Sequence, residues 1–171
     1  MSRILIIYYS RKGENYWNGH IKHLTQGNTA VIAQMIADLT GGDLFEIDTA
    51  VPYPEGYYDC IQQAKTELQE NARPALRAYP NSLAGYDTIF LGYPNWWGTM
   101  PMPVFTLLEH CDLTGKRIFP FCTNEGSGMG NSEADLRRLC PGAALGPGLS
   151  IHGAEAAQSF DKVAAWVRKV I

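Results

Sequence analysis

Apolar runs alternate with amphipathic stretches from one end of the chain to the other. The apolar runs are short and rich in β-branched and aromatic residues, and their continuous apolar character is typical of a parallel sheet that is covered on both faces. They predict strands at residues 3–9, 44–47, 86–93, 116–122 and 144–151. Apolar positions spaced three and four residues apart predict helices over residues 28–39, 57–71, 101–110, 132–139 and 154–170.

Strands that alternate with helices form βαβ units, whose strands lie parallel in one sheet. No internal repeat, linker or low-complexity tract interrupts residues 1–171, and this is a usual length for one domain. We therefore expect a single three-layer α/β domain with a doubly wound, five-stranded parallel sheet. The connections at residues 11–26 and 48–57 are longer than such units need, and long loops at strand ends commonly carry function.

Composition excludes several classes of function. With 46% hydrophobic and 18% charged residues the chain is globular, and a net charge of −3 provides no basic surface for nucleic acid or a membrane. No apolar run reaches the ~18–20 residues that cross a bilayer, and the first residues lack a signal-peptide pattern. The cysteines form no C-x-x-C pair, and no carboxylate or cysteine completes a metal site with His20 and His23. We expect free thiols in a reducing cytoplasm at Cys60, Cys111, Cys122 and Cys140.

The first candidate binding segment joins the first predicted strand to its helix. Ligands of open α/β sheets bind beyond the carboxyl ends of the strands, where Ser10 and then Gly27-Asn28-Thr29-Ala30 stand. Free N–H groups and the dipole of a helix N-terminus suit a phosphate, although from these residues alone helix capping is the slightly better account of Asn28 and Thr29. The patterns of Walker A loops and of Rossmann dinucleotide sites are absent.

The second candidate segment is a tryptophan pair, Trp96-Trp97, between Pro94-Asn95 and Gly98. Two adjacent tryptophans in a loop are hard to bury on one face, and an exposed aromatic plane suits stacking on a flat ring system. Pro94 stiffens the approach to the pair, and Gly98 permits backbone conformations that other residues resist. A packing or protein-contact role is the alternative, but the pair with these neighbours favours a ligand.

The third candidate segment follows the fourth predicted strand and runs Thr123-Asn124-Glu125-Gly126-Ser127-Gly128. Its glycines let the backbone approach a ligand, although glycine-rich turns are common. Glu125 is either a ligand-binding carboxylate or a solvated loop acid. Together, the three segments predict a site for a mononucleotide with a flat ring.

In order and spacing these segments resemble the flavodoxin family, in particular members with an extended first loop. The matching stretches are residues 9–10 with 27–29, residues 86–98 and residues 121–128. The resemblance implies the sheet order 2-1-3-4-5 and FMN at the point where the winding reverses. It implies phosphate contacts from Ser10, Gly27, Asn28, Thr29 and Ala30, ring contacts from Pro94, Asn95, Trp96, Trp97 and Gly98, and contacts to the opposite or pyrimidine edge from Thr123, Asn124, Glu125, Gly126 and Ser127. Which tryptophan stacks on the ring stays open, with Trp97 favoured.

The resemblance also implies a function, a low-potential electron-transfer protein that serves redox partner proteins as a monomer or weak dimer. An FMN-dependent NAD(P)H quinone or azo reductase is the alternative, because residues 11–26 contain aromatic and histidine residues. That insertion splits the phosphate motif, so Arg11, Lys12 or Asn15 either joins the site or covers it. A receiver-type signalling domain is disfavoured, because residues 9–10 and 93–94 lack the acids that it needs.

Overall fold

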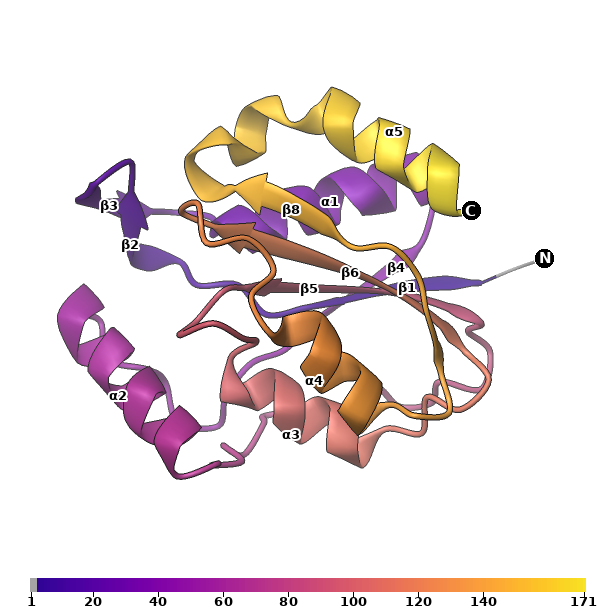
Figure 1. Cartoon of the computed structure of the whole chain (residues 1–171), viewed down its shortest axis with the longest axis horizontal. Helices are drawn as coiled ribbons and strands as arrows, with labels where there is room; N and C mark the ends of the chain where they lie inside the picture. The colour runs from indigo at the N-terminus through magenta and orange to yellow at the C-terminus, as the bar shows by residue number, and fades with distance from the viewer. Residues whose placement is uncertain (1–2) are drawn as a thin grey trace.

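A computed structural model describes residues 3–171 and contains one mostly buried parallel sheet with helices on both faces (Figure 1). The four long strands lie side by side in the order β4 (Asp43–Glu46), β1 (Ile4–Tyr8), β5 (Thr88–Pro94) and β6 (Arg117–Asn124). Each neighbouring pair is parallel. The prediction of a doubly wound sheet in the order 2-1-3-4-5 is confirmed, and most element ends differ from the expected ones by one or two residues.

The fifth strand differs from its prediction. Residues 144–151 form two pieces, β7 (Ala144–Leu145) and β8 (Leu149–His152), which both pair with β6. Pro147 stands between them and has no N–H to donate to the ladder, so the strand cannot continue through it. The predicted closing helix is also divided, into the 3₁₀ helix η1 (Gly153–Gln158) and α5 (Phe160–Val170).

The helices cover the two faces of the sheet unequally (Figure 1). Helices α1 (Asn28–Thr40) and α5 lie together on one face. Helices α3 (Met102–His110) and α4 (Ser132–Leu139) cover the other, and α2 (Tyr57–Gln69) packs beside α3 at its edge. None of the helices within residues 3–171 is long and apolar enough to cross a membrane.

Alternate residues of the central strands build two separate cores. Leu5 and Ile7 of β1 pack on the α3 and α4 side, whereas Ile6 packs on the α1 and α5 side. Leu91 and Phe90 of β5 divide in the same way. Burying a side chain of this size contributes about 1.5–3 kcal/mol, so the strands that carry the site loops are firmly held.

Residues 11–26 are not an irregular loop. They contain an antiparallel hairpin, β2 (Gly13–Trp17) and β3 (His20–Leu24), which stands apart from the main sheet. Asn18 and Gly19 form its turn with φ angles of 49° and 89°. Asn-Gly is the dipeptide that two-residue hairpin turns favour, and it is the signal in the sequence that predicts this hairpin. Periodicity does not reveal it, because both strands are mostly polar.

Candidate functional site

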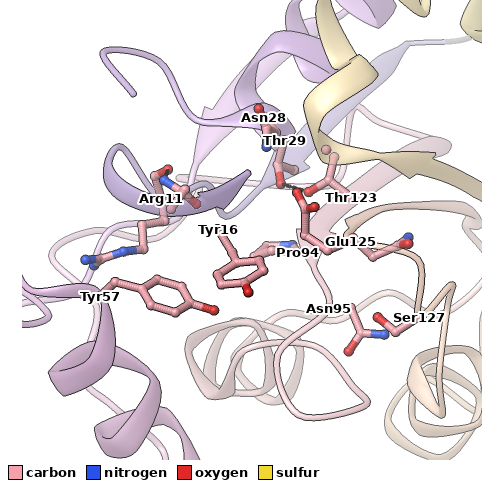
Figure 2. A pocket seen from close by; sticks show the side chains of 13 residues that line it. Arg11, Tyr16, Asn28, Thr29, Tyr57, Pro94, Asn95, Thr123, Glu125 and Ser127 are labelled. Carbon is pink, nitrogen blue, oxygen red and sulfur yellow. Dashed lines mark hydrogen bonds between the residues drawn. The ribbon is translucent and has the colours of Figure 1, made fainter. Parts of the chain in front are cut away.

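A pocket of about 180 Å³ lies beyond the carboxyl ends of the central strands (Figure 2). It brings together eight of the predicted residues, namely Asn28, Thr29, Pro94, Asn95, Thr123, Asn124, Glu125 and Ser127. Of the insertion residues for which the sequence left the choice open, Arg11 and Asn15 line the pocket and Lys12 does not. Tyr16, Tyr57 and Gly153 also line it. Figure 2 shows Tyr16 and Tyr57 on one side of the pocket and Glu125, Asn95 and Ser127 on the other.

The first turn of α1 forms the back of the pocket. The helix-capping interpretation of Asn28 and Thr29 is not supported, because the N-cap is Gly27 and it makes no side-chain cap. Within residues 3–171, the N–H groups of Asn28 and Thr29 have no hydrogen-bond acceptor. The Ala30 N–H donates to Ser10 Oγ at 3.1 Å. The free N–H groups of Asn28 and Thr29, together with the helix dipole, make this turn suitable for an anionic group.

Two glycines let the backbone close in around this turn. A Cβ at Gly27 would lie 2.2 Å from Ser10 Oγ and 2.5 Å from the Arg11 carbonyl oxygen. A Cβ at Gly153 would lie 2.6 Å from Asn28 Nδ2. Any other residue at either position would push these groups apart. Both glycines therefore preserve the shape of this part of the pocket, which we call the phosphate cradle (Ser10 and residues 27–30).

The floor of the pocket joins α1 to β6. Thr29 and Thr123 share a hydrogen bond of 2.8 Å between their hydroxyl groups, and both residues are buried. A buried hydroxyl is costly when it lacks a partner, so this bond fixes the start of α1 against the end of β6.

The two tryptophans have different surroundings, and neither lines the pocket. Trp96 packs inward against Tyr9 and Tyr53, with ring centroids 5.2 Å apart in each pair. Trp97 is 45% exposed, and its Nε1–H donates to the Ile61 carbonyl oxygen of α2 at 2.8 Å. Ring contacts from the pair therefore stay a prediction, and the aromatic residues that line the pocket come from elsewhere.

The tryptophan loop has an unusual backbone. Trp97 and Gly98 have φ angles of 57° and 89°, and Trp96 and Thr99 are paired on either side of them. This is the geometry of a two-residue turn, in which Trp97 occupies a left-handed conformation that bulky residues rarely adopt. The contact of its indole with α2 helps to hold this conformation.

Hydrogen bonds join the tryptophan loop to the glycine-rich loop. Asn95 Nδ2 donates to the Gly128 carbonyl oxygen at 2.9 Å, and the Asn131 N–H donates to the Gly98 carbonyl oxygen at 2.7 Å. Gly130 sits so close that a Cβ would lie 2.3 Å from the Gly98 oxygen. The two predicted loops therefore form one continuous wall, which we call the sheet wall (residues 94–98 and 123–131).

The opposite side of the pocket, which we call the hairpin wall, consists of β2 and the start of α2. The rings of Tyr16 and Tyr57 lie with centroids 5.7 Å apart, and the Tyr57 N–H donates to a Glu14 carboxylate oxygen at 2.7 Å. Burial, and then the nearby Tyr16, raise the pKa of Tyr57 above its ordinary value, so its phenol stays neutral. Sequence reasoning missed both tyrosines as site residues, because nothing in the local pattern brings the hairpin to α2.

The described residues offer neither a reactive thiol nor a metal site. All four cysteines are free, and burial raises the pKa of Cys122 to about 12 and that of Cys140 to about 11. Burial also raises the pKa of Cys60 and Cys111. Residues 3–171 contain no group of three potential metal-binding side chains.

Comparison with known proteins places the chain in a family. A model of the family described as Flavodoxin matches residues 22–170. A crystallised candidate flavoprotein from Bacteroides uniformis is 30% identical over 98% of each chain, with a TM-score of 0.79. One from Bacteroides eggerthii is 28% identical over 99% of this chain and 98% of its own, also with a TM-score of 0.79.

A flavoprotein from Lactobacillus acidophilus, crystallised in complex with FMN, shares the fold at 19% identity and a TM-score of 0.66, over 96% of this chain and 99% of its own. A comparison with curated proteins gives no significant match. The family model spans most of the sequence, and the Bacteroides uniformis protein is similar to this chain in sequence and in fold. This chain therefore belongs to the flavodoxin family.

Proposed function

We propose that the pocket binds FMN and that the protein is a low-potential electron carrier. The observation that carries the proposal is the first turn of α1, where free N–H groups at Asn28 and Thr29 lie beside the Ser10 hydroxyl at the carboxyl edge of the sheet. Membership of the flavodoxin family supports the choice of FMN over other phosphorylated ligands.

In this proposal each segment has its own task. Ser10, Gly27 and the N–H groups of Asn28 and Thr29 hold the phosphate, and the Ala30 N–H holds the Ser10 hydroxyl in place. The sheet wall and the tyrosines of the hairpin wall bound the flat ring and exclude water. Bound FMN supplies the one- and two-electron chemistry. The whole chain, residues 1–171, then acts as one FMN-binding domain.

The charges around the pocket support a low potential. Glu125 lines the pocket and disfavours added negative charge there. The Arg11 guanidinium acts in the opposite direction, and it donates to the carbonyl oxygens of Pro54 and Glu55. The net charge of −3 of the whole chain acts in the same direction as Glu125.

A reductase that takes electrons from NAD(P)H is the second candidate function. One observation favours it, a cleft of about 570 Å³ next to the pocket, bounded by the hairpin and residues 53–55 and sharing Arg11 with the pocket. We rank it second because the family model that matches residues 22–170 is described as Flavodoxin, which favours an electron carrier over a reductase.

Stopped-flow mixing of the FMN-loaded protein with NADPH separates the two functions. The electron carrier predicts no loss of flavin absorbance on mixing with NADPH alone, but rapid loss when a flavodoxin reductase is added. Rapid bleaching by NADPH alone, followed by turnover with a quinone, would show that the reductase assignment is correct.

We further propose that the protein works in the cytoplasm with redox partner proteins. Free cysteines support this location, because a reducing compartment keeps such thiols unpaired. Cross-linking of the reduced and oxidised protein in a cell extract, with identification of the linked proteins, tests the partners.

A further inference from the structure

Hydrogen bonds join the tip of the hairpin β2–β3, at Asn18, to the far side of the pocket; we call these bonds the tie at Asn18. The Asn18 N–H donates to Glu125 Oε2 at 3.2 Å, and Asn18 Oδ1 lies 2.9 Å from His152 Nε2. Glu125 belongs to the loop after β6, and His152 is the last residue of β8. A turn residue of the hairpin therefore meets two elements of the main domain that lie more than 100 positions away in the sequence.

The proton on the histidine can be assigned from its neighbours. Nε2 faces Asn18 Oδ1 and also lies 3.5 Å from Glu125 Oε2. Both neighbours are acceptors, so Nε2 carries the hydrogen and donates it to Asn18. His152 then determines the position of Asn18, and the Asn18 N–H in turn bonds Glu125, which lines the pocket.

The hairpin is held at its base as well as at its tip. Its two ends are the two halves of the phosphate cradle, Ser10 and Gly27, which are packed against each other. Between base and tip, Asn15 and Tyr16 line the pocket. The hairpin therefore spans the pocket from the cradle to the opposite rim.

The hairpin β2–β3 makes few contacts that would hold it in place. A two-stranded hairpin is marginally stable in isolation, and β2 and β3 pair with no strand of the main sheet. Apart from its base, where Leu24 is buried, the hairpin is joined to the domain by the hydrogen bonds of the tie at Asn18, the Tyr16–Tyr57 ring contact and the Glu14–Tyr57 hydrogen bond. Segments with so few contacts open locally without global unfolding.

We propose that His152 is a positioning residue for the cofactor, which acts through Asn18 to hold the hairpin β2–β3 closed over the pocket and so slows cofactor release. The inference rests on the proposed binding of FMN. It assigns a role to two residues, His152 and Asn18, that do not themselves line the pocket.

Single substitutions at Asn18 and His152 remove the hydrogen bond between the two side chains. Asn18→Gly removes the side-chain oxygen but suits the left-handed backbone at φ 49° and keeps the N–H that bonds Glu125. His152→Ala removes the donor, whereas His152→Gln supplies another side-chain N–H donor. His20→Ala is the matched control, because His20 is an exposed residue of the same hairpin with no hydrogen bond to the domain among the described residues.

The measurement is the rate at which FMN leaves each variant, monitored by the return of flavin fluorescence after dilution, with the melting temperature of the apo-protein taken in parallel. Loss of one hydrogen bond corresponds to about a two- to tenfold faster release for His152→Ala and for Asn18→Gly. The double variant should be no faster than the faster single variant, because both changes break the same bond. His152→Gln should restore slow release, and His20→Ala should match the natural protein.

Three results would overturn the proposal. Release rates of His152→Ala and Asn18→Gly that match the natural protein would overturn it, even if the melting temperature falls, because the residues would then be merely structural. Effects that add in full in the double variant would show that the two residues act separately. If the natural protein does not bind FMN at all, the proposed function and this inference both fail, whereas the first two results leave FMN binding intact.

Discussion

The two walls of the pocket are built in different ways. The sheet wall grows out of β5 and β6, whose residues are almost all buried, and its two loops are joined by hydrogen bonds from Asn95 and Asn131. In the hairpin wall the residues of β2 are only partly buried and Tyr16 is exposed, and the wall is held by the Tyr16–Tyr57 contact and by the hydrogen bonds of the tie at Asn18. Folding of the core therefore preforms one wall, while the other can move without disturbing the core.

The largest expected effect comes from breaking the sheet wall at Gly130. Gly130→Ala places a Cβ 2.3 Å from the Gly98 carbonyl oxygen and forces alanine into φ +54°. We expect the free energy of unfolding to fall by about 2–4 kcal/mol, and FMN affinity to fall with it, because the loops must separate. Urea denaturation measures the first quantity.

Gly41→Ala is the control for that change. Gly41 has a φ of +69°, but a Cβ there meets no atom within 4 Å. It should cost only about 1 kcal/mol, the backbone part of the effect. If Gly130→Ala is no more destabilising than Gly41→Ala, the close contact between the two loops is not important for stability.

The next effect tests the floor that joins the sheet wall to α1. Thr123→Val keeps the shape of the side chain but leaves the buried Thr29 hydroxyl without its 2.8 Å partner. We expect a loss of about 1–3 kcal/mol in the free energy of unfolding, measured by urea denaturation. Adding Thr29→Val should recover part of this loss, because no unpaired hydroxyl then remains. A double variant that is less stable than Thr123→Val would contradict this account.

Alkaline pH should weaken the sheet wall through Cys122. Burial raises the pKa of this thiol in the folded protein to about 12, from an ordinary value of 9.0. Between about pH 9 and pH 12 the unfolded chain loses the proton while the folded chain keeps it. The free energy of unfolding should therefore fall by about 1.4 kcal/mol per pH unit from this group.

Urea midpoints measured from neutral to alkaline pH test this prediction, with Cys122→Ala as the comparison. The variant should be less stable at neutral pH but should lose stability less steeply above pH 9. Identical slopes for the two proteins would contradict the burial of this thiol.

The smallest effect on stability is expected in the hairpin wall. Tyr16 is 39% exposed, so Tyr16→Ala should lower the free energy of unfolding by less than about 1 kcal/mol. FMN affinity should nevertheless fall about tenfold, because the ring bounds the pocket. Fluorescence titration measures the affinity.

Ile21→Ala is the control for this change, because Ile21 lies opposite Tyr16 in the same hairpin. It should leave the FMN affinity unchanged. Equal effects of the two changes would argue against a specific role for Tyr16.

The difference between the sheet wall and the hairpin wall also explains how much of the structure the sequence could predict. The strands of the sheet wall and the loops after them follow from continuous apolar runs such as Ile89–Leu91 and from the rule that ligands bind at strand ends. The hairpin does not follow, because its strands are polar and only Asn18-Gly19 indicates it. The pairing of Tyr16 with Tyr57 depends on how the hairpin packs on α2, which no local pattern encodes.

Two further differences have local causes. Pro147 divides the last strand, although the apolar residues on both sides of it predict one strand. The sequence predicts a single aromatic surface for the tryptophan pair, yet Trp96 packs against Tyr9 and Tyr53, and Trp97, in a left-handed backbone conformation, contacts α2. A backbone conformation that is rare for tryptophan cannot be expected from composition alone.

The central claim, that the first turn of α1 holds the phosphate of a flavin, is tested most directly by titrating the apo-protein with FMN and with riboflavin and following flavin fluorescence. Riboflavin has the same ring but no phosphate, so only FMN can use the free N–H groups of Asn28 and Thr29. We predict binding of one FMN per chain, with riboflavin weaker by on the order of 10- to 100-fold. Equal affinity for the two flavins, or no change in fluorescence with FMN, would contradict the claim.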